Sequence, residues 1–216
     1  MIKSLLLKFL YLIVFTSILL LEIVFTKSSK ADSLLKEAEQ FILLNEVSGI
    51  WQFKAYKDTQ WTICNGITYT FEKTKKKKRK CKLYDNNKKY KYICYIKKGD
   101  IFTLKECKKQ SKLHINYHID KLENQFLIGK SKRNWYHKIN NNHKVFLIDI
   151  LFNYGETRQD VKDLFDIVKE LINYPNEENK KKFIQQTLAL CETKQKKYLK
   201  GQLNRCNRRI MKFIDG

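Results

Sequence analysis

One stretch of the chain is so apolar that its composition almost dictates where it must lie. Residues 144–155 read KVFLIDILFNYG, with hydrophobic side chains at most positions. A run of this length suits three helical turns, and a helix that is hydrophobic on most sides is buried. Gly155 follows as a residue suited to end the helix. The sequence therefore predicts a buried central helix around which the other elements pack.

Other segments show the apolar spacing of helices that are buried on one face only. Thr103 and Glu106 form a capping box at the start of one of them. Thr157, together with Asp160, is predicted to cap another, and Pro175 follows its end. The predicted helices cover residues 32–46, 103–126, 157–173, 177–192 and 202–215.

The first thirty-one residues differ from the rest. Two lysines precede an uncharged run from Phe9 to Leu21, which Glu22 interrupts. This run is short for a bilayer span but fits the apolar region of a signal peptide. We expect residues 1–31 to be a signal peptide or, alternatively, a signal anchor, and residues 32–216 to form one domain. A secreted or periplasmic monomer is expected, with membrane contact only through this segment.

The chain is strongly basic, with 44 Lys and Arg residues against 22 acidic ones and a formal net charge of +22. Charge of this sign predicts an anionic partner. Export argues against nucleic acid, and the excess of lysine over arginine favours diffuse attraction over bidentate phosphate recognition. The anionic bacterial envelope is the expected partner. The basic block at residues 75–80 is interpreted as a solvated loop or, alternatively, as a cationic arm that holds an anionic polymer.

Six cysteines in an exported chain indicate disulfides. Cys81 and Cys94 bracket a segment that reads as a β-hairpin turning at residues 85–87, so we expect them to pair. For the other four, alternatives stay open. No Cys-x-x-Cys spacing supports a zinc site. His114 and His118 are interpreted as lying on a solvated helix face rather than binding metal, and no metal or cofactor is expected.

The stretch from Glu46 to Thr68 holds two acidic side chains among aromatic and small residues. Glu46 would end the first helix. Residues 53–58 and 61–64 alternate apolar and polar like short strands, with Asp58 at the turn between them. Paired carboxylates that face a cleft can hydrolyse glycosidic bonds, because one protonates the leaving oxygen while the other activates water or attacks carbon.

This stretch resembles the phage-type lysozymes, glycoside hydrolase family 24. The resemblance is carried by Ala55-Tyr56-Lys57-Asp58 and by Thr62-Ile63 with Gly66, while Glu46 matches the family's glutamate if three residues are inserted after it. Three later segments resemble the family in the same order along the chain. They are Thr103–Cys107, residues 145–155, which end in Phe152-Asn153-Tyr154-Gly155, and residues 201–216, whose lead-in Lys200–Arg205 resembles the family's Gly-Leu-x-x-Arg-Arg.

The resemblance implies a lysozyme-like α+β fold, in which a small β-hairpin lobe packs on a mainly helical lobe with a cleft between them. It implies hydrolysis of the β-1,4 bond between N-acetylmuramic acid and N-acetylglucosamine in peptidoglycan glycan strands. Glu46 would be the general acid, Asp58 would act on the opposite face of the sugar, and Thr62 would position the water.

The resemblance also bears on the remaining cysteines and on residues 72–100. Cys64 and Cys107 fall in matching segments and are expected to pair, which leaves Cys191 with Cys206. Residues 72–100 are then a Lys-rich hairpin insertion. Two other functions stay open: a catalytically inactive lysozyme-fold protein that binds the cell wall or disrupts envelopes through its charge, and a basic nucleic-acid binder.

Overall fold

The computed structural model describes residues 16, 32–42, 61–64, 66–84, 90–127, 139–191 and 199–215. The chain divides into two compact units, Met1–Lys36 and Glu37–Gly216. The second unit is mainly helical and contains a small three-stranded antiparallel sheet, which confirms the α+β class. Among the described residues, no helix combines the length and the apolar character needed to cross a membrane.

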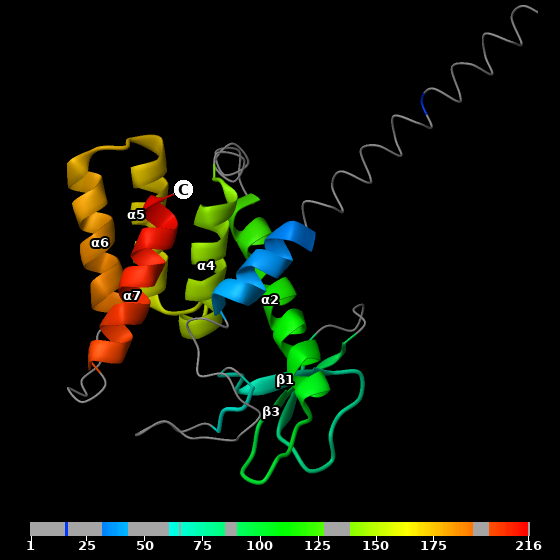
Figure 1. Ribbon diagram of the computed structural model, residues 1–216. Coiled ribbons are helices and arrows are strands. Elements are labelled where there is room, and N and C mark those ends of the chain that lie inside the picture. The colour runs from blue at the N-terminus through cyan, green and yellow to red at the C-terminus, as the bar shows by residue number, and fades with distance from the viewer. Residues whose placement is uncertain are drawn as a thin grey trace, which may run out of the picture. The chain divides into compact units, whose positions relative to one another are not determined.

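The predicted central helix is α4 (Asn141–Tyr154), and it is buried as expected. Seven consecutive residues, from Val145 to Leu151, are buried. Asn140 caps the start by accepting a hydrogen bond from the His143 N–H at 2.9 Å. Gly155 ends the helix with a φ of +78°, and its N–H donates to the Leu151 carbonyl. In Figure 1, α4 lies among the other helices, and it packs against α2 (Leu104–Leu127), α5 (Gln159–Asn173) and α7 (Leu199–Ile214).

The packing of α4 continues into α6 (Glu177–Cys191) and α7 through aromatic rings. Phe183 lies 5.4 Å from Phe146 and 4.4 Å from Phe213 between ring centroids. The expected disulfide between Cys191 and Cys206 is confirmed, and it ties α6 to α7. Residues 37–42 are helical, with Ala38 and Ile42 buried, and Glu37 pairs with Lys212 of α7 at 2.6 Å.

The start of α5 differs from the prediction. The N-cap position is Arg158 rather than Thr157, and no side chain caps the helix there. Asp160 does not act with Thr157 as predicted, because its carboxylate is bonded by the Arg158 guanidinium and by the Val161 N–H. The predicted end is confirmed, since α5 stops at Asn173, before Pro175.

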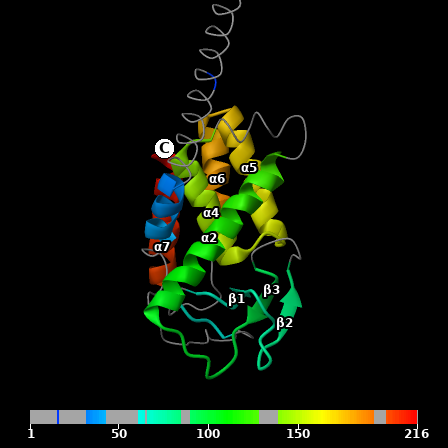
Figure 2. The ribbon, with the colours of Figure 1, turned by 90° about the vertical axis from the view of Figure 1, so that its right-hand side faces the viewer.

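The sheet consists of β1 (Tyr69–Glu72), β2 (Cys81–Leu83) and β3 (Tyr92–Tyr95). Its strand order is β1-β3-β2, as Figure 2 shows. The hairpin and its disulfide are confirmed, because β2 and β3 are antiparallel and Cys81 lies directly opposite Cys94. The Lys-rich segment 72–100 thus supplies the central strand as well as one edge strand. The predicted turn at residues 85–87 lies outside the described residues.

Candidate functional site

The three residues predicted to carry catalysis are not all described by the structure. Glu46 and Asp58 lie outside the described residues. Thr62 is described, and its side chain is buried, with 7% of its surface exposed. It immediately precedes Ile63, whose backbone N–H and carbonyl exchange hydrogen bonds of 2.9 and 2.8 Å with Ile67. Thr62 therefore lies directly before a tight, hydrogen-bonded turn.

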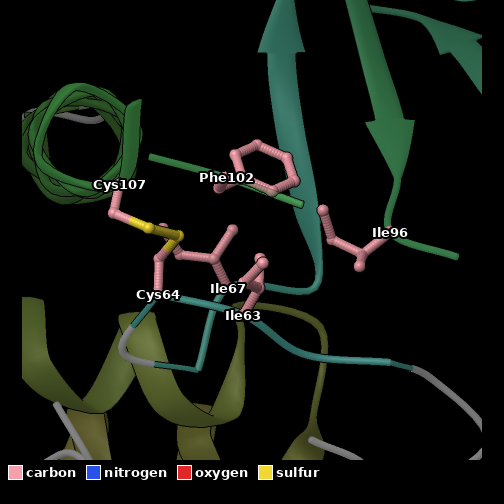
Figure 3. Close-up of a cluster of buried hydrophobic side chains, with 6 residues drawn as sticks. All are labelled: Ile63, Cys64, Ile67, Ile96, Phe102 and Cys107. Carbon is pink, nitrogen blue, oxygen red and sulfur yellow. A yellow bond between two sulfur atoms is a disulfide. The ribbon is translucent and has the colours of Figure 1, made fainter. Parts of the chain in front are cut away.

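The turn after Thr62 has a strained backbone that a disulfide holds in place. Cys64 has a φ of +50°, unusual for a residue other than glycine, and Gly66 has a φ of +88°. The predicted disulfide from Cys64 to Cys107 is confirmed, and it fastens the turn to the first turns of α2. Figure 3 shows both cysteines within a small apolar cluster. Its members are Ile63, Cys64, Ile67, Ile96, Phe102 and Cys107.

The capping box predicted at the start of α2 is confirmed. The Glu106 carboxylate accepts hydrogen bonds from the Thr103 N–H and hydroxyl, both at 2.8 Å. The Glu106 N–H in turn donates to the Thr103 hydroxyl oxygen at 3.2 Å. These bonds hold the pKa of Glu106 below its ordinary value. The start of α2 is thus determined one residue beyond Thr103, which places Cys107 beside the turn.

Side chains of α2 complete the hydrogen bonding of β1, which is an edge strand. The Gln110 side-chain amide accepts from the Phe71 N–H at 3.0 Å and donates to the Phe71 carbonyl at 3.3 Å. His114 donates from Nε2 to the Tyr69 carbonyl at 2.8 Å. These contacts satisfy backbone groups that would otherwise invite another strand. Through these contacts, α2 takes part in the hydrogen bonding of the sheet.

The expectation that His114 and His118 lie on a solvated face is wrong. Both rings are buried, and they flank the Phe152 ring with centroid distances of 6.1 and 5.9 Å. Burial disfavours the charged imidazolium and lowers the pKa of His114 to about 4 and that of His118 to about 3. Both rings are therefore neutral at pH 7. Their face was misassigned because α2 packs against β1 as well as α4, so its buried side is wide.

A buried ion pair joins α4 to α7. Asp149, in the middle of α4, pairs with Nε of Arg209. Asn153 donates from Nδ2 to the Asp149 carboxylate at 3.1 Å and to its backbone carbonyl at 2.9 Å. Arg209 also donates to the Tyr154 hydroxyl at 3.3 Å. Asn153 therefore satisfies a backbone carbonyl and the buried carboxylate near the end of the helix.

Asp149 and Arg209 did not appear among the residues selected from the sequence. A signal was available, since Asp149 is an acid within the most apolar run of the chain. A buried carboxylate requires a partner, but the sequence does not say which of the many basic residues provides it.

A separate hollow lies among the helices. Its volume is about 360 Å³, and its lining is mostly apolar with one lysine. None of the residues predicted to carry catalysis lines it. The lining consists of His143, Leu171, Ile172, Pro175, Lys180, Phe213 and Ile214.

These observations define a disulfide-stabilised α+β protein. All six cysteines are paired, which is typical of proteins from oxidising compartments. Within the described ranges, no group of three or more His, Cys, Asp or Glu side chains is placed to hold a metal ion. Comparisons with protein-family models, with curated proteins and with solved structures found no match to this chain.

Proposed function

We propose that the protein is an exported lysozyme that hydrolyses the β-1,4 bond between N-acetylmuramic acid and N-acetylglucosamine in peptidoglycan. The observation that carries the proposal is the meeting of separate segments that resemble phage-type lysozymes. Ile63 and Cys64 from the first, Cys107 from the second and Phe152 from the third pack in or against one apolar cluster. The fourth segment contributes Arg209, which pairs with Asp149 of α4. Asp149 lies one helical turn before Asn153 and is hydrogen-bonded to it.

The convergence matters because these segments are far apart along the chain. A chance resemblance would not require the turn after Thr62, the start of α2 and the end of α4 to pack together. In this protein a disulfide and a shared cluster hold them. Thr62, whose proposed role is to position one water, directly precedes this constrained turn.

In the proposed mechanism, Glu46 protonates the leaving oxygen and Asp58 acts as the base that activates water on the opposite face. Carboxyl groups roughly 6.5–9.5 Å apart leave room for that water and produce inversion at the anomeric carbon. We therefore expect the newly formed reducing end to appear first as the α-anomer. Proton NMR of the products during the first minutes of reaction measures this directly.

The decisive experiment compares variants of the chain from residue 32 on purified peptidoglycan from which the attached anionic polymers have been removed. E46Q should lower the rate of turbidity loss about 10²–10⁴-fold, since proton transfer contributes that much. E39Q is the matched control, because Glu39 is an acid that lies shortly before Glu46, in the first helix, and this variant should leave the rate unchanged. Equal rates for E46Q and the wild type would refute the assignment of Glu46.

The same experiment separates the two main candidate functions. A wild-type protein that binds peptidoglycan but releases no reducing ends is the inactive cell-wall binder. The separation between lysozyme and binder thus depends on product formation and not on binding.

A further inference from the structure

The sheet carries a concentration of positive charge on one side. Residues 72–100 contain thirteen Lys and Arg residues against three acidic ones, a net charge of +10 out of +22 for the chain. Side chains of β1 alternate between two faces. Tyr69 and Phe71 contact His114 of α2, whereas Thr70 and Glu72 contact Arg79. Residues 73–80, which connect β1 to β2, therefore lie against the face that α2 leaves uncovered.

Arg79 anchors this connection to the protein. Its side chain is 14% exposed and pairs through Nε with Asp100 at 2.9 Å. It also donates to the Thr70 hydroxyl at 3.2 Å and lies 5.1 Å from the centre of the Phe102 ring. Arg79 also pairs with the Glu72 carboxylate of β1 at 3.8 Å. The arginine of the basic block is thus structural, because it pairs with both nearby carboxylates.

The lysines that precede Arg79 are exposed instead. Lys73, Lys75, Lys77 and Lys78 are exposed, and no carboxylate of the described residues is recorded in an ion pair with them. Lys76, half exposed, lies 3.7 Å from Glu72. We call these five residues the lysine surface.

The backbone that bears the lysine surface is held at several points. The Arg79 N–H donates to the Lys76 carbonyl at 3.1 Å, and the Tyr95 N–H of β3 donates to the Lys80 carbonyl at 2.9 Å. The Cys81–Cys94 disulfide follows directly. A fixed backbone loses less conformational entropy when a ligand binds than a free tail does. The lysine side chains therefore extend from a backbone whose position is fixed.

We propose that the lysine surface binds a linear anionic polymer of the bacterial cell wall, whose charge lies on phosphodiester groups along a flexible chain. Nucleic acid shares this chemistry but fits less well. Residues 73–80 contain no aromatic side chain on which a base could stack, and their one arginine points into the protein. The three disulfides also indicate an oxidising compartment. The inference deepens the proposed function by naming what holds the protein on the wall, but it does not require hydrolysis.

The test measures binding of the full chain to poly(glycerol phosphate) at several salt concentrations. The triple variant K75Q/K77Q/K78Q should bind about ten- to a hundred-fold more weakly at low salt, and its affinity should depend less steeply on salt. The matched control is K162Q/K181Q/K182Q, which removes the same charge from exposed lysines of α5 and α6. Its affinity should change little. K75R/K77R/K78R, which keeps the charge, should bind like the wild type.

Near-UV circular dichroism and thermal melting verify that each variant is folded. Equal weakening by the two glutamine triples would overturn the inference, because attraction would then be a property of net charge alone. Loss confined to single-stranded DNA, with poly(glycerol phosphate) binding unaffected, would also overturn it. Hydrolysis is assayed separately on polymer-free peptidoglycan, so failure of the proposed lysozyme activity and failure of polymer binding give distinct results.

Discussion

The helices and the sheet of the second unit are stabilised by different means. In the helical part, α4 buries seven consecutive residues, and the rings of Phe146, Phe183 and Phe213 pack on one another. In the sheet, the strands are three or four residues long and the adjoining apolar cluster is small. Two of the three disulfides lie there, and α2 side chains complete the hydrogen bonds of β1.

The difference shows what a small sheet needs. Strands this short bury too little apolar surface to be stable alone, so they depend on packing against a helix and on covalent links. The face away from α2 is covered by residues 73–80, since Arg79 contacts Thr70 and Glu72 there, and the lysines of this connection stay exposed.

The largest effect is expected in the helical part, at the buried ion pair. Arg209→Met leaves the Asp149 carboxylate buried without its cation, which costs about 3–5 kcal/mol. Urea denaturation measures this loss. The double variant D149L/R209M should recover most of it, because neither charge then remains. A loss below about 1 kcal/mol for the single variant would mean that the pair does not hold α4 to α7.

The disulfide at the turn should matter nearly as much for the sheet. Cys64 and Cys107 are 43 residues apart, and the loop-entropy relation gives about 4 kcal/mol for C64A/C107A. For C191A/C206A, with a separation of 15, it gives about 3 kcal/mol. Hydrogen exchange should show residues 66–72 opening in the first variant only. Faster exchange there in both variants would contradict the division between sheet and helices.

The third prediction concerns the loss of folding stability at acidic pH. Because the pKa values of His114 and His118, about 4 and about 3, lie below the ordinary 6.5, the unfolded chain binds more protons from pH 6.5 downward. The folded state therefore loses stability as the pH falls through this window, by about 2 kcal/mol per histidine at pH 5. His118→Leu should flatten the dependence between pH 7 and pH 5.

His143→Leu is the matched control for this pH dependence. Burial lowers the pKa of His143 too, but its ring at the start of α4 is only partly buried, so the flattening should be smaller. Urea unfolding at both pH values provides the comparison. An unchanged slope for His118→Leu would mean that its ring is not buried in solution.

The smallest effect is expected from the helix caps. Thr103→Ala removes the capping box of α2 and should cost about 1 kcal/mol. Thr157→Ala should cost less than about 0.5 kcal/mol, because Thr157 is exposed and does not cap α5. Thermal melting of the two variants ranks them. If Thr157→Ala were more destabilising than Thr103→Ala, Thr157 would cap α5 as the sequence predicted.

Several features follow from the sequence because short-range physics determines them. The apolar run at residues 144–155 requires a buried helix, and Thr103 with Glu106 can cap only the helix that follows them. Cys81 and Cys94 lie opposite each other because the hairpin between them brings them together. Of the candidate site, the disulfide that anchors the turn after Thr62 was expected only from the resemblance to phage-type lysozymes, and the roles of Glu46, Asp58 and Thr62 stay predictions.

Other features were decided by tertiary structure. His114 is buried because its ring contacts Tyr69 and Phe71 of β1, some forty residues away, and the ring of His118 lies against Phe152 of α4. Asp149 could have paired with many basic residues, and only the approach of α7 selects Arg209. Likewise, the basic block does not reveal that Arg79 turns inward while its lysines turn outward. The physical reason is common to all three: burial and pairing are set by contacts between distant segments, which local sequence patterns do not encode.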